Sequence, residues 1–174
     1  MRYFIIESDP EFNDLPFFRD WHQKIDVRFI KKGLTKKLPF RELVFIYPNP
    51  ELVFSGVIIK PFILLTREIK NIVSKYQRGV VYKEIVLLDD ENELTQLYYL
   101  AIVDEVDCLH ESSGFNRQGT VLEKPVLIHN MIRDKSLFKI ADTCSSYTVI
   151  RLDLLESVLR RDVRGLQLTP VDLC

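Results

Sequence analysis

Cysteine is scarce in this sequence, and long apolar runs are missing. The three cysteines, Cys108, Cys144 and Cys174, lie far apart and show neither a CxxC pair nor a Cys/His ligand spacing, which argues against a disulfide framework and the common zinc sites. No segment approaches the roughly 20 apolar residues that a membrane-spanning helix needs. The apolar run at residues 3–6 is too short for a secretory signal. We therefore expect a cytoplasmic protein with free thiols.

An excess of charge of either sign is also missing, and so are the common catalytic motifs. The 24 basic and 25 acidic residues leave a net charge of -1, so the whole molecule has no strong attraction for nucleic acid or for an anionic membrane. The sequence contains no Gly-rich phosphate loop, no GxSxG and no HExxH. These absences favour a non-enzymatic protein with no catalytic residue, no metal site and no cofactor.

The sequence does contain enough apolar material for a substantial core. Of its 174 residues, 47% are hydrophobic and 11% are aromatic, as expected for a globular chain. The strongest pattern covers residues 80–103, in which two segments rich in β-branched and aromatic residues flank an acidic turn at residues 89–93. This pattern predicts an antiparallel hairpin.

Two amphipathic helices are predicted, one before and one after the hairpin in the sequence. The first covers about residues 66–78, where apolar residues recur at helical spacing after Thr66, the expected N-cap. The second covers about residues 154–161 and follows Asp153, which begins a pattern like a capping box. The predicted fold class is therefore α+β, with a mixed, mainly antiparallel sheet whose central hairpin is packed by both helices.

A proline-rich segment at residues 48–61 gives the only sign of a division in the chain. It separates an N-terminal lobe, residues 1–60, from a helix–hairpin–strand–helix lobe, residues 61–174. No repeat or flexible linker is present, so we expect the lobes to pack as one globular unit. Short strands are predicted at residues 3–6 and 27–30.

The densest polar cluster follows the hairpin and consists of Asp104, Glu105, Asp107, His110 and Glu111. Carboxylates and an imidazole are suitable metal ligands, and His110 beside Glu111 can serve as an acid–base pair. A small metal-dependent hydrolase using Asp107, His110 and Glu111 is therefore one alternative. The spacing matches no established ligand pattern, however, and neighbours on a strand point to opposite faces, which favours a solvated strand end.

A second alternative rests on basic residues between positions 28 and 41. They are Arg28, Lys31, Lys32, Lys36, Lys37 and Arg41, and no acid interrupts residues 27–40. Such a run can neutralise phosphates, and Phe29 and Phe40 can stack on bases, as in a nucleic-acid-binding module. Most basic runs are solvated surfaces, so nucleic acid is the less favoured partner.

Several features after residue 60 occur in a recognisable order. They are the segment 61–65 that leads into a helix, Leu-Tyr-Tyr-Leu at 97–100, Val-Asp-Cys-Leu at 106–109, Phe115 and Asn116 in a loop, the strand 147–150, Leu-Arg-Arg at 159–161, and Gly165. This order resembles bacterial immunity proteins found with polymorphic toxins, many of them described as domains of unknown function, over about residues 61–168. The resemblance implies a protein that binds and blocks a toxin and that turns over no substrate.

We therefore predict a cytoplasmic immunity-type protein that neutralises a partner toxin by masking it and that binds no membrane. The partner surface is expected at the acidic strand end and in the polar loop after it, because an acidic surface attracts a basic toxin and speeds association. The predicted contact residues are Asp104, Glu105, Asp107, Glu111, Phe115, Asn116 and Arg117.

Overall fold

The predicted hairpin is the longest pair of strands in the computed structural model, which describes residues 1–174. Its strands, β5 (Val81–Asp89) and β6 (Leu94–Ile102), pair antiparallel along their whole length. Asp89 shapes the turn, because its carboxylate accepts hydrogen bonds from the backbone N–H groups at positions 91 and 92. The prediction over residues 80–103 is confirmed.

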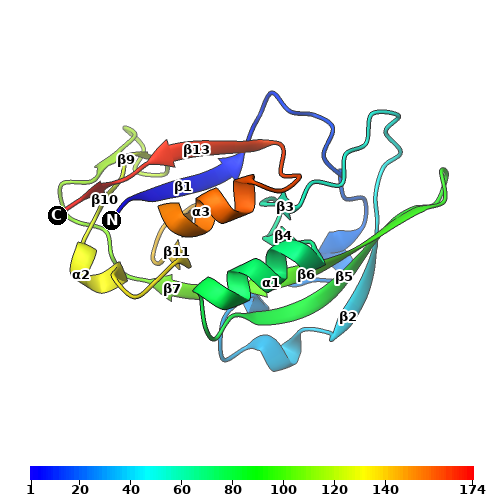
Figure 1. Ribbon diagram of the computed structural model, residues 1–174, viewed down its shortest axis with the longest axis horizontal. Coiled ribbons are helices and arrows are strands. Elements are labelled where there is room, and N and C mark those ends of the chain that lie inside the picture. The colour runs from blue at the N-terminus through cyan, green and yellow to red at the C-terminus, as the bar shows by residue number, and fades with distance from the viewer.

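The hairpin belongs to the first of two five-stranded sheets, which lie next to one another (Figure 1). In spatial order, the first sheet consists of β2 (Arg41–Phe45), β5, β6, β4 (Leu64–Leu65) and β3 (Val57–Ile58). The second consists of β13 (Leu166–Pro170), β1 (Tyr3–Ser8), β12 (Thr148–Arg151), β11 (Leu137–Ile140) and β7 (Asp104–Val106). Neighbouring strands are antiparallel except at one edge of each sheet, where β2 pairs with β5 and β7 pairs with β11. The α+β class with mainly antiparallel pairing is confirmed.

The chain passes directly from one sheet to the other, because only Val103 separates β6 from β7. The smaller elements are β8 (Gly114–Phe115) paired with β9 (Leu122–Lys124), β10 (Val126–Leu127) paired with β14 (Asp172–Leu173), and the short helix α2 (His129–Ile132). Residues 1–60 supply β1 to one sheet and β2 and β3 to the other. The division into lobes near residue 60 stays a prediction.

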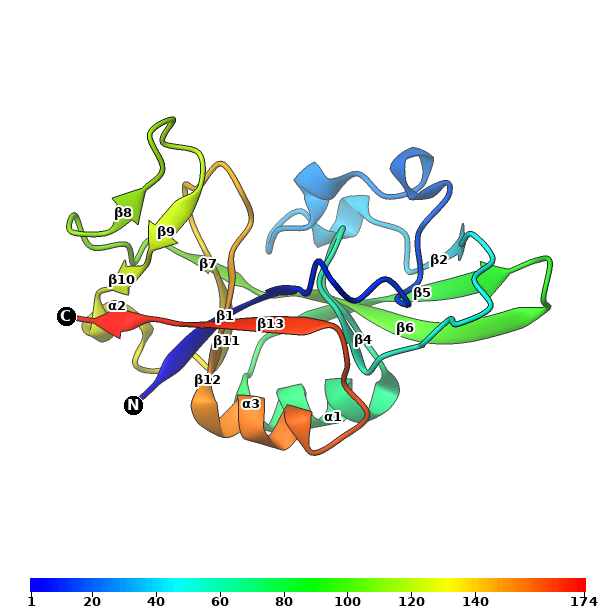
Figure 2. The same cartoon turned by 90° about the horizontal axis from the view of Figure 1, so that it is seen from above.

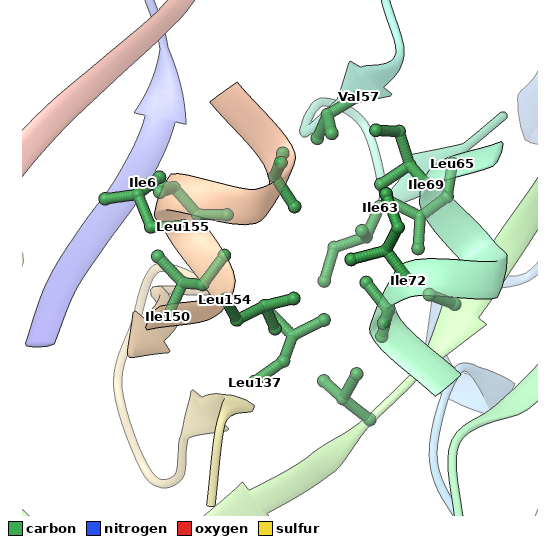
Figure 3. Packing of buried hydrophobic residues seen from close by; sticks show 14 residues of the cluster. Ile6, Val57, Ile63, Leu65, Ile69, Ile72, Leu137, Ile150, Leu154 and Leu155 are labelled. Atoms are coloured by element: carbon green, nitrogen blue, oxygen red, sulfur yellow. The ribbon is translucent and has the colours of Figure 1, made fainter. Parts of the chain in front are cut away.

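Two helices, α1 (Arg67–Tyr76) and α3 (Leu152–Leu159), lie side by side across one face of both sheets (Figure 2). Figure 3 shows their apolar side chains meeting those of the sheets, with Ile69 from α1 and Leu154 from α3 in one buried cluster. Complete burial of each such side chain contributes roughly 1.5–3 kcal/mol before the cost of ordering it. The first predicted helix is confirmed, and it begins directly after Thr66.

The second predicted helix is confirmed, but α3 begins at Leu152, two residues earlier than expected. Arg151 occupies the N-cap position, and Asp153 lies within the first turn. The Asp153 carboxylate oxygen Oδ1 pairs with Arg151 Nε at 2.8 Å, so the ion pair ties the start of the helix to β12. A carboxylate in the first turn also complements the helix dipole. No helix in the structure is long and apolar enough to cross a membrane.

The segment formed by residues 16–40, called here the N-terminal cover, lies on the face of the first sheet opposite the helices (Figure 2). Its buried side chains Ile25, Ile30 and Leu38 pack against apolar side chains of β2, β5 and β6. This packing explains how a segment with few regular elements keeps a defined position: its apolar residues are buried one at a time between polar ones.

The strand predicted at residues 27–30 is wrong, because Val27–Phe29 forms a 3-10 helix. Asp26 accounts for the difference, since its carboxylate accepts a hydrogen bond from the backbone N–H of Arg28 at 3.0 Å and so caps a helical turn. Two further 3-10 helices, Trp21–Gln23 and Thr35–Lys37, complete the cover.

Candidate functional site: a cleft between the two sheets

A cleft of about 760 Å³ lies where the N-terminal cover meets the second sheet. Its residues come from distant parts of the sequence: the cover at 16–22, the loop between β3 and β4 at 59–63, and the end of β11 together with the loop and start of β12. The volume falls within the range of about 300–1,000 Å³ that is usual for ligand sites. Figure 2 shows these segments on the side of the sheets opposite α1 and α3.

One wall of the cleft is aromatic and held by ring contacts. The rings of Trp21 and His22 are stacked with centroids 3.6 Å apart, and Trp21 meets the buried ring of Phe62 edge to face at 5.6 Å. Offset and edge-to-face ring pairs of this kind stabilise one arrangement of the side chains. This wall is therefore a preformed aromatic surface.

The rim beside this wall exposes large apolar side chains. Phe17 is 72% exposed and packs on Tyr47, itself 46% exposed, with ring centroids 5.5 Å apart. Val121, the last residue of the loop between β8 and β9, also lines the cleft and is 48% exposed. Exposed apolar side chains gathered around one cleft mark a surface suited to binding.

The opposite wall carries a lysine on an otherwise apolar strand. Lys139 lies on β11 between the buried residues Phe138 and Ile140, and in register with Thr148 of β12 and Glu105 of β7. Burial lowers the pKa of the Lys139 ammonium, the negative charge of Glu105 opposes this shift, and the positive charge of Lys31 adds to it. Glu105 is paired with Lys31 at 3.2 Å, and Lys139 forms no ion pair.

Free hydrogen-bond donors outnumber carboxylates in the cleft. The side chains of Trp21, Lys60, Lys139, Ser145, Ser146 and Thr148 all line it, and none of them forms a hydrogen bond or an ion pair within the protein. Lys60, Ser145 and Ser146 are exposed, Trp21 and Lys139 are partly buried, and Thr148 is buried. Glu7 supplies the only carboxylate. The cleft can therefore satisfy a ligand rich in acceptor atoms.

Two of the predicted contact residues are occupied by internal ion pairs. Asp104 pairs with Lys32 at 2.6 Å and with Lys135 at 3.0 Å. Partial burial alone raises the pKa of the Asp104 carboxyl, but hydrogen bonds from both ammonium groups outweigh burial and hold the pKa below its usual value. Together with the pairing of Glu105 and Lys31, these contacts fasten the N-terminal cover to β7.

The other predicted contact residues lie on or near the hairpin formed by β8 and β9. Asp107, Glu111 and Arg117 are exposed, and Phe115 is 40% exposed. Asn116 shapes the turn, because its Oδ1 accepts hydrogen bonds from the backbone N–H groups at positions 120 and 121. This turn leads directly into Val121, so the predicted loop adjoins the cleft.

The residues of the metal-site alternative do not converge. His110 Nδ1 forms a hydrogen bond with Ser112 Oγ at 2.8 Å, and no three side chains of His, Cys, Asp or Glu are placed to hold a metal ion together. Cys108, between Asp107 and Leu109, is buried, and burial together with the charge of Asp107 raises the pKa of its thiol to about 12.

The basic run of the nucleic-acid alternative is largely paired. Besides Lys31 and Lys32, Arg28 pairs with Asp26 at 2.6 Å and Arg41 pairs with Glu84 at 2.5 Å. Lys36 and Lys37 form no ion pair, and Lys37 lies over the ring of Phe29. Four of the six cations thus already have a carboxylate partner, which leaves a weak positive patch.

Sequence reasoning missed the cleft, because its residues are spread over the chain from Glu7 to Thr148. The available signals were the aromatic run at residues 16–22 and a single cation on an apolar strand at Lys139. No family model, no curated protein and no solved structure matches the chain. The resemblance to immunity proteins therefore stays a prediction.

Proposed function

We propose that this protein is a non-enzymatic binding protein of the immunity type, which neutralises a partner toxin in the cytoplasm by covering part of its surface. The observation that carries the proposal is the cleft, with exposed apolar side chains at its rim and unpaired donors within it. A protein partner would bury both kinds of group at once, as the centres of protein interfaces do.

The exposed rim favours a protein over a small ligand. Phe17 is 72% exposed at the rim and Tyr47, 46% exposed, lies outside the lining of the cleft, so a small molecule enclosed by the walls would leave much of both rings in water. Tight masking needs an interface of about 1,200–2,000 Å² in total, which extends well past one cleft. The adjoining hairpin with Phe115 and Arg117 would then lie inside the interface, whereas Asp104 and Glu105 already have internal partners.

The experiment is capture of the toxin by tagged protein from a lysate of the native host, washed at high salt, followed by a test of the captured protein's toxicity. Three versions are compared: the natural chain, Phe17→Asp at the rim, and Phe40→Asp as a matched control. Phe40 is 70% exposed and lies outside the cleft, so the two variants make the same change at equal exposure.

We expect the natural chain and Phe40→Asp to capture one dominant protein and to abolish its toxicity when co-expressed, and Phe17→Asp to lose both properties. A captured protein whose toxicity is unchanged by the natural chain would contradict the immunity function. Equal capture and protection by Phe17→Asp would move the interface away from the cleft rim.

A further inference from the structure

We propose that the cleft binds an acidic peptide segment of the partner, with one apolar side chain against the aromatic wall and carboxylates on the side of Lys139. This inference rests on the proposed function, because it assumes that a protein is bound, and it adds the chemistry of the segment that enters the cleft.

The first argument is the unpaired charge. Lys139 is held on β11 by pairing on both sides, to β12 and to β7, so its ammonium is presented to the cleft from a rigid strand. The charged groups around it are Lys31 and Glu105, which pair with one another, and Glu7 and Lys60, which line the same cleft. A carboxylate brought by a ligand would supply the partner that this partly buried cation lacks.

The second argument is the hydrogen-bonding character of the same wall. Ser145 and Ser146 lie in the loop just before β12, both are exposed, and their hydroxyl groups have no partner in the protein. Main-chain carbonyls and side-chain carboxylates of a peptide accept hydrogen bonds, and an acidic segment offers both along its length. Lys60, from the loop between β3 and β4, adds a second cation.

The third argument is the aromatic wall opposite. The stacked rings of Trp21 and His22, with the buried ring of Phe62 edge to face against Trp21, form an aromatic surface that is already in place before binding. An aliphatic or aromatic side chain buried there loses water without any rearrangement of the wall, which limits the entropy cost of binding. An apolar residue flanked by acids fits both walls of the cleft.

The lining also favours carboxylates over phosphates. No arginine and no glycine lines the cleft. Phosphate sites commonly use arginine forks or the backbone N–H groups of glycine-rich loops. Two lysines on separate elements suit the separate carboxylates of a peptide chain better than one compact phosphate group.

The test uses Trp21, the only tryptophan of the chain, as a fluorescent reporter inside the cleft. The full chain is titrated with capped eight-residue peptides that share a central leucine and differ only in their flanks, which are Asp and Glu, Asn and Gln, or Lys. We expect a saturable change in Trp21 emission with the acidic peptides and none with the neutral or basic peptides. Added salt should weaken binding of the acidic peptides. A peptide without aromatic residues leaves the tryptophan signal free of interference.

Two variants assign the effect to the cleft. Lys139→Gln is expected to weaken binding of the acidic peptide by about tenfold or more, because it removes a charge-assisted hydrogen bond. Lys60→Gln, at an exposed position where folding is not at risk, should weaken it by a smaller factor. The matched control is Lys75→Gln, an exposed lysine of α1 on the far side of the sheets, which should leave the affinity within about twofold.

Equal binding of the neutral peptides, no response to any peptide, or unchanged affinity in both Lys139→Gln and Lys60→Gln would each overturn the inference. So would displacement of the acidic peptide by a nucleotide of higher affinity. The inference and the proposed function fail separately. If Lys139→Gln still captures and neutralises the toxin with full affinity, the inference alone is lost; if acidic peptides bind but no captured protein is neutralised, the proposed function alone is lost.

Discussion

The two faces of the paired sheets are covered in different ways. On one face, α1 and α3 span the junction between the sheets, and a single cluster of 14 buried apolar residues joins helix and strand side chains from both. On the other face, the N-terminal cover lies over the first sheet and the loops around β8, β9 and β12 lie over the second (Figure 2). The helix side is closed, and the cover side leaves the cleft.

The difference follows from the residues that reach the junction. On the helix side they are aliphatic and recur at helical spacing, so a continuous apolar contact forms. On the cover side the contact between the halves is electrostatic, with Lys31 and Lys32 bound to the acids of β7. These ion pairs hold the N-terminal cover next to β7 without filling the space between the cover and the second sheet. An opening lined with polar and aromatic groups is therefore compatible with a stable fold.

Truncation on the helix side should have the largest effect on stability. Leu154 is completely buried in the cluster between α3 and the sheets, so Leu154→Ala should lower the free energy of unfolding by about 2–5 kcal/mol. Phe17→Ala, at the exposed rim on the other side, should change it by less than about 0.5 kcal/mol. Urea unfolding of both variants measures the contrast, and a loss below about 1 kcal/mol for Leu154→Ala would mean that the helix side is not the tighter contact.

Removing the ion pairs on the cover side should have an intermediate effect that depends on pH. Asp104→Asn should cost about 1–2 kcal/mol at neutral pH, because Lys32 and Lys135 lose a shared carboxylate. The folded pKa of Asp104 is lowered, so its stabilising contribution is present above the pKa of the unfolded chain, about 3.9, and is lost as the pH falls through the folded pKa.

The measurement is urea unfolding of the natural chain and Asp104→Asn from pH 7 down to pH 3, with the exposed and unpaired Asp107→Asn as control. The gap between the natural chain and Asp104→Asn should narrow below about pH 4, and Asp107→Asn should show no such gap. A gap that stays constant with pH would show that the lost contacts are not ionic.

The helix side of the fold could be predicted from the sequence because its signals are local. The hairpin over residues 80–103 has its strands and its turn adjacent in the chain, and α1 has its apolar face within one segment. The strand expected at residues 27–30 fails because a single side chain, Asp26, caps a 3-10 turn there. Strand propensity alone does not show that a side-chain cap competes with strand formation at these residues.

The cleft could not be predicted, because it depends on tertiary placement. The sequence predicts that the carboxylates of Asp104 and Glu105 are unpaired and exposed. In the fold, however, they form ion pairs with lysines more than 70 positions earlier in the chain. Lys139 shows the reverse: it has acids nearby in the sequence, and the fold leaves it without an ion pair. The tertiary fold decides which charges are paired, and no pattern within a single segment contains that information.

Replacing the unpaired cation should have the smallest effect on stability, and in the opposite direction. Lys139→Met keeps the length of the side chain and removes a partly buried charge, so we expect the free energy of unfolding at pH 7 to rise by about 0.5–1 kcal/mol. The folded pKa of Lys139 is lowered, so its charge destabilises the fold at neutral pH. That penalty is relieved as the pH rises through the folded pKa towards the unfolded value of about 10.4. The gain in Lys139→Met over the natural chain should therefore shrink in urea unfolding as the pH rises towards about 10.4, whereas its binding of acidic peptides is weakened already at pH 7. A loss of stability at pH 7 would show instead that Lys139 is held by the protein's own groups, and the two faces would then differ in packing alone.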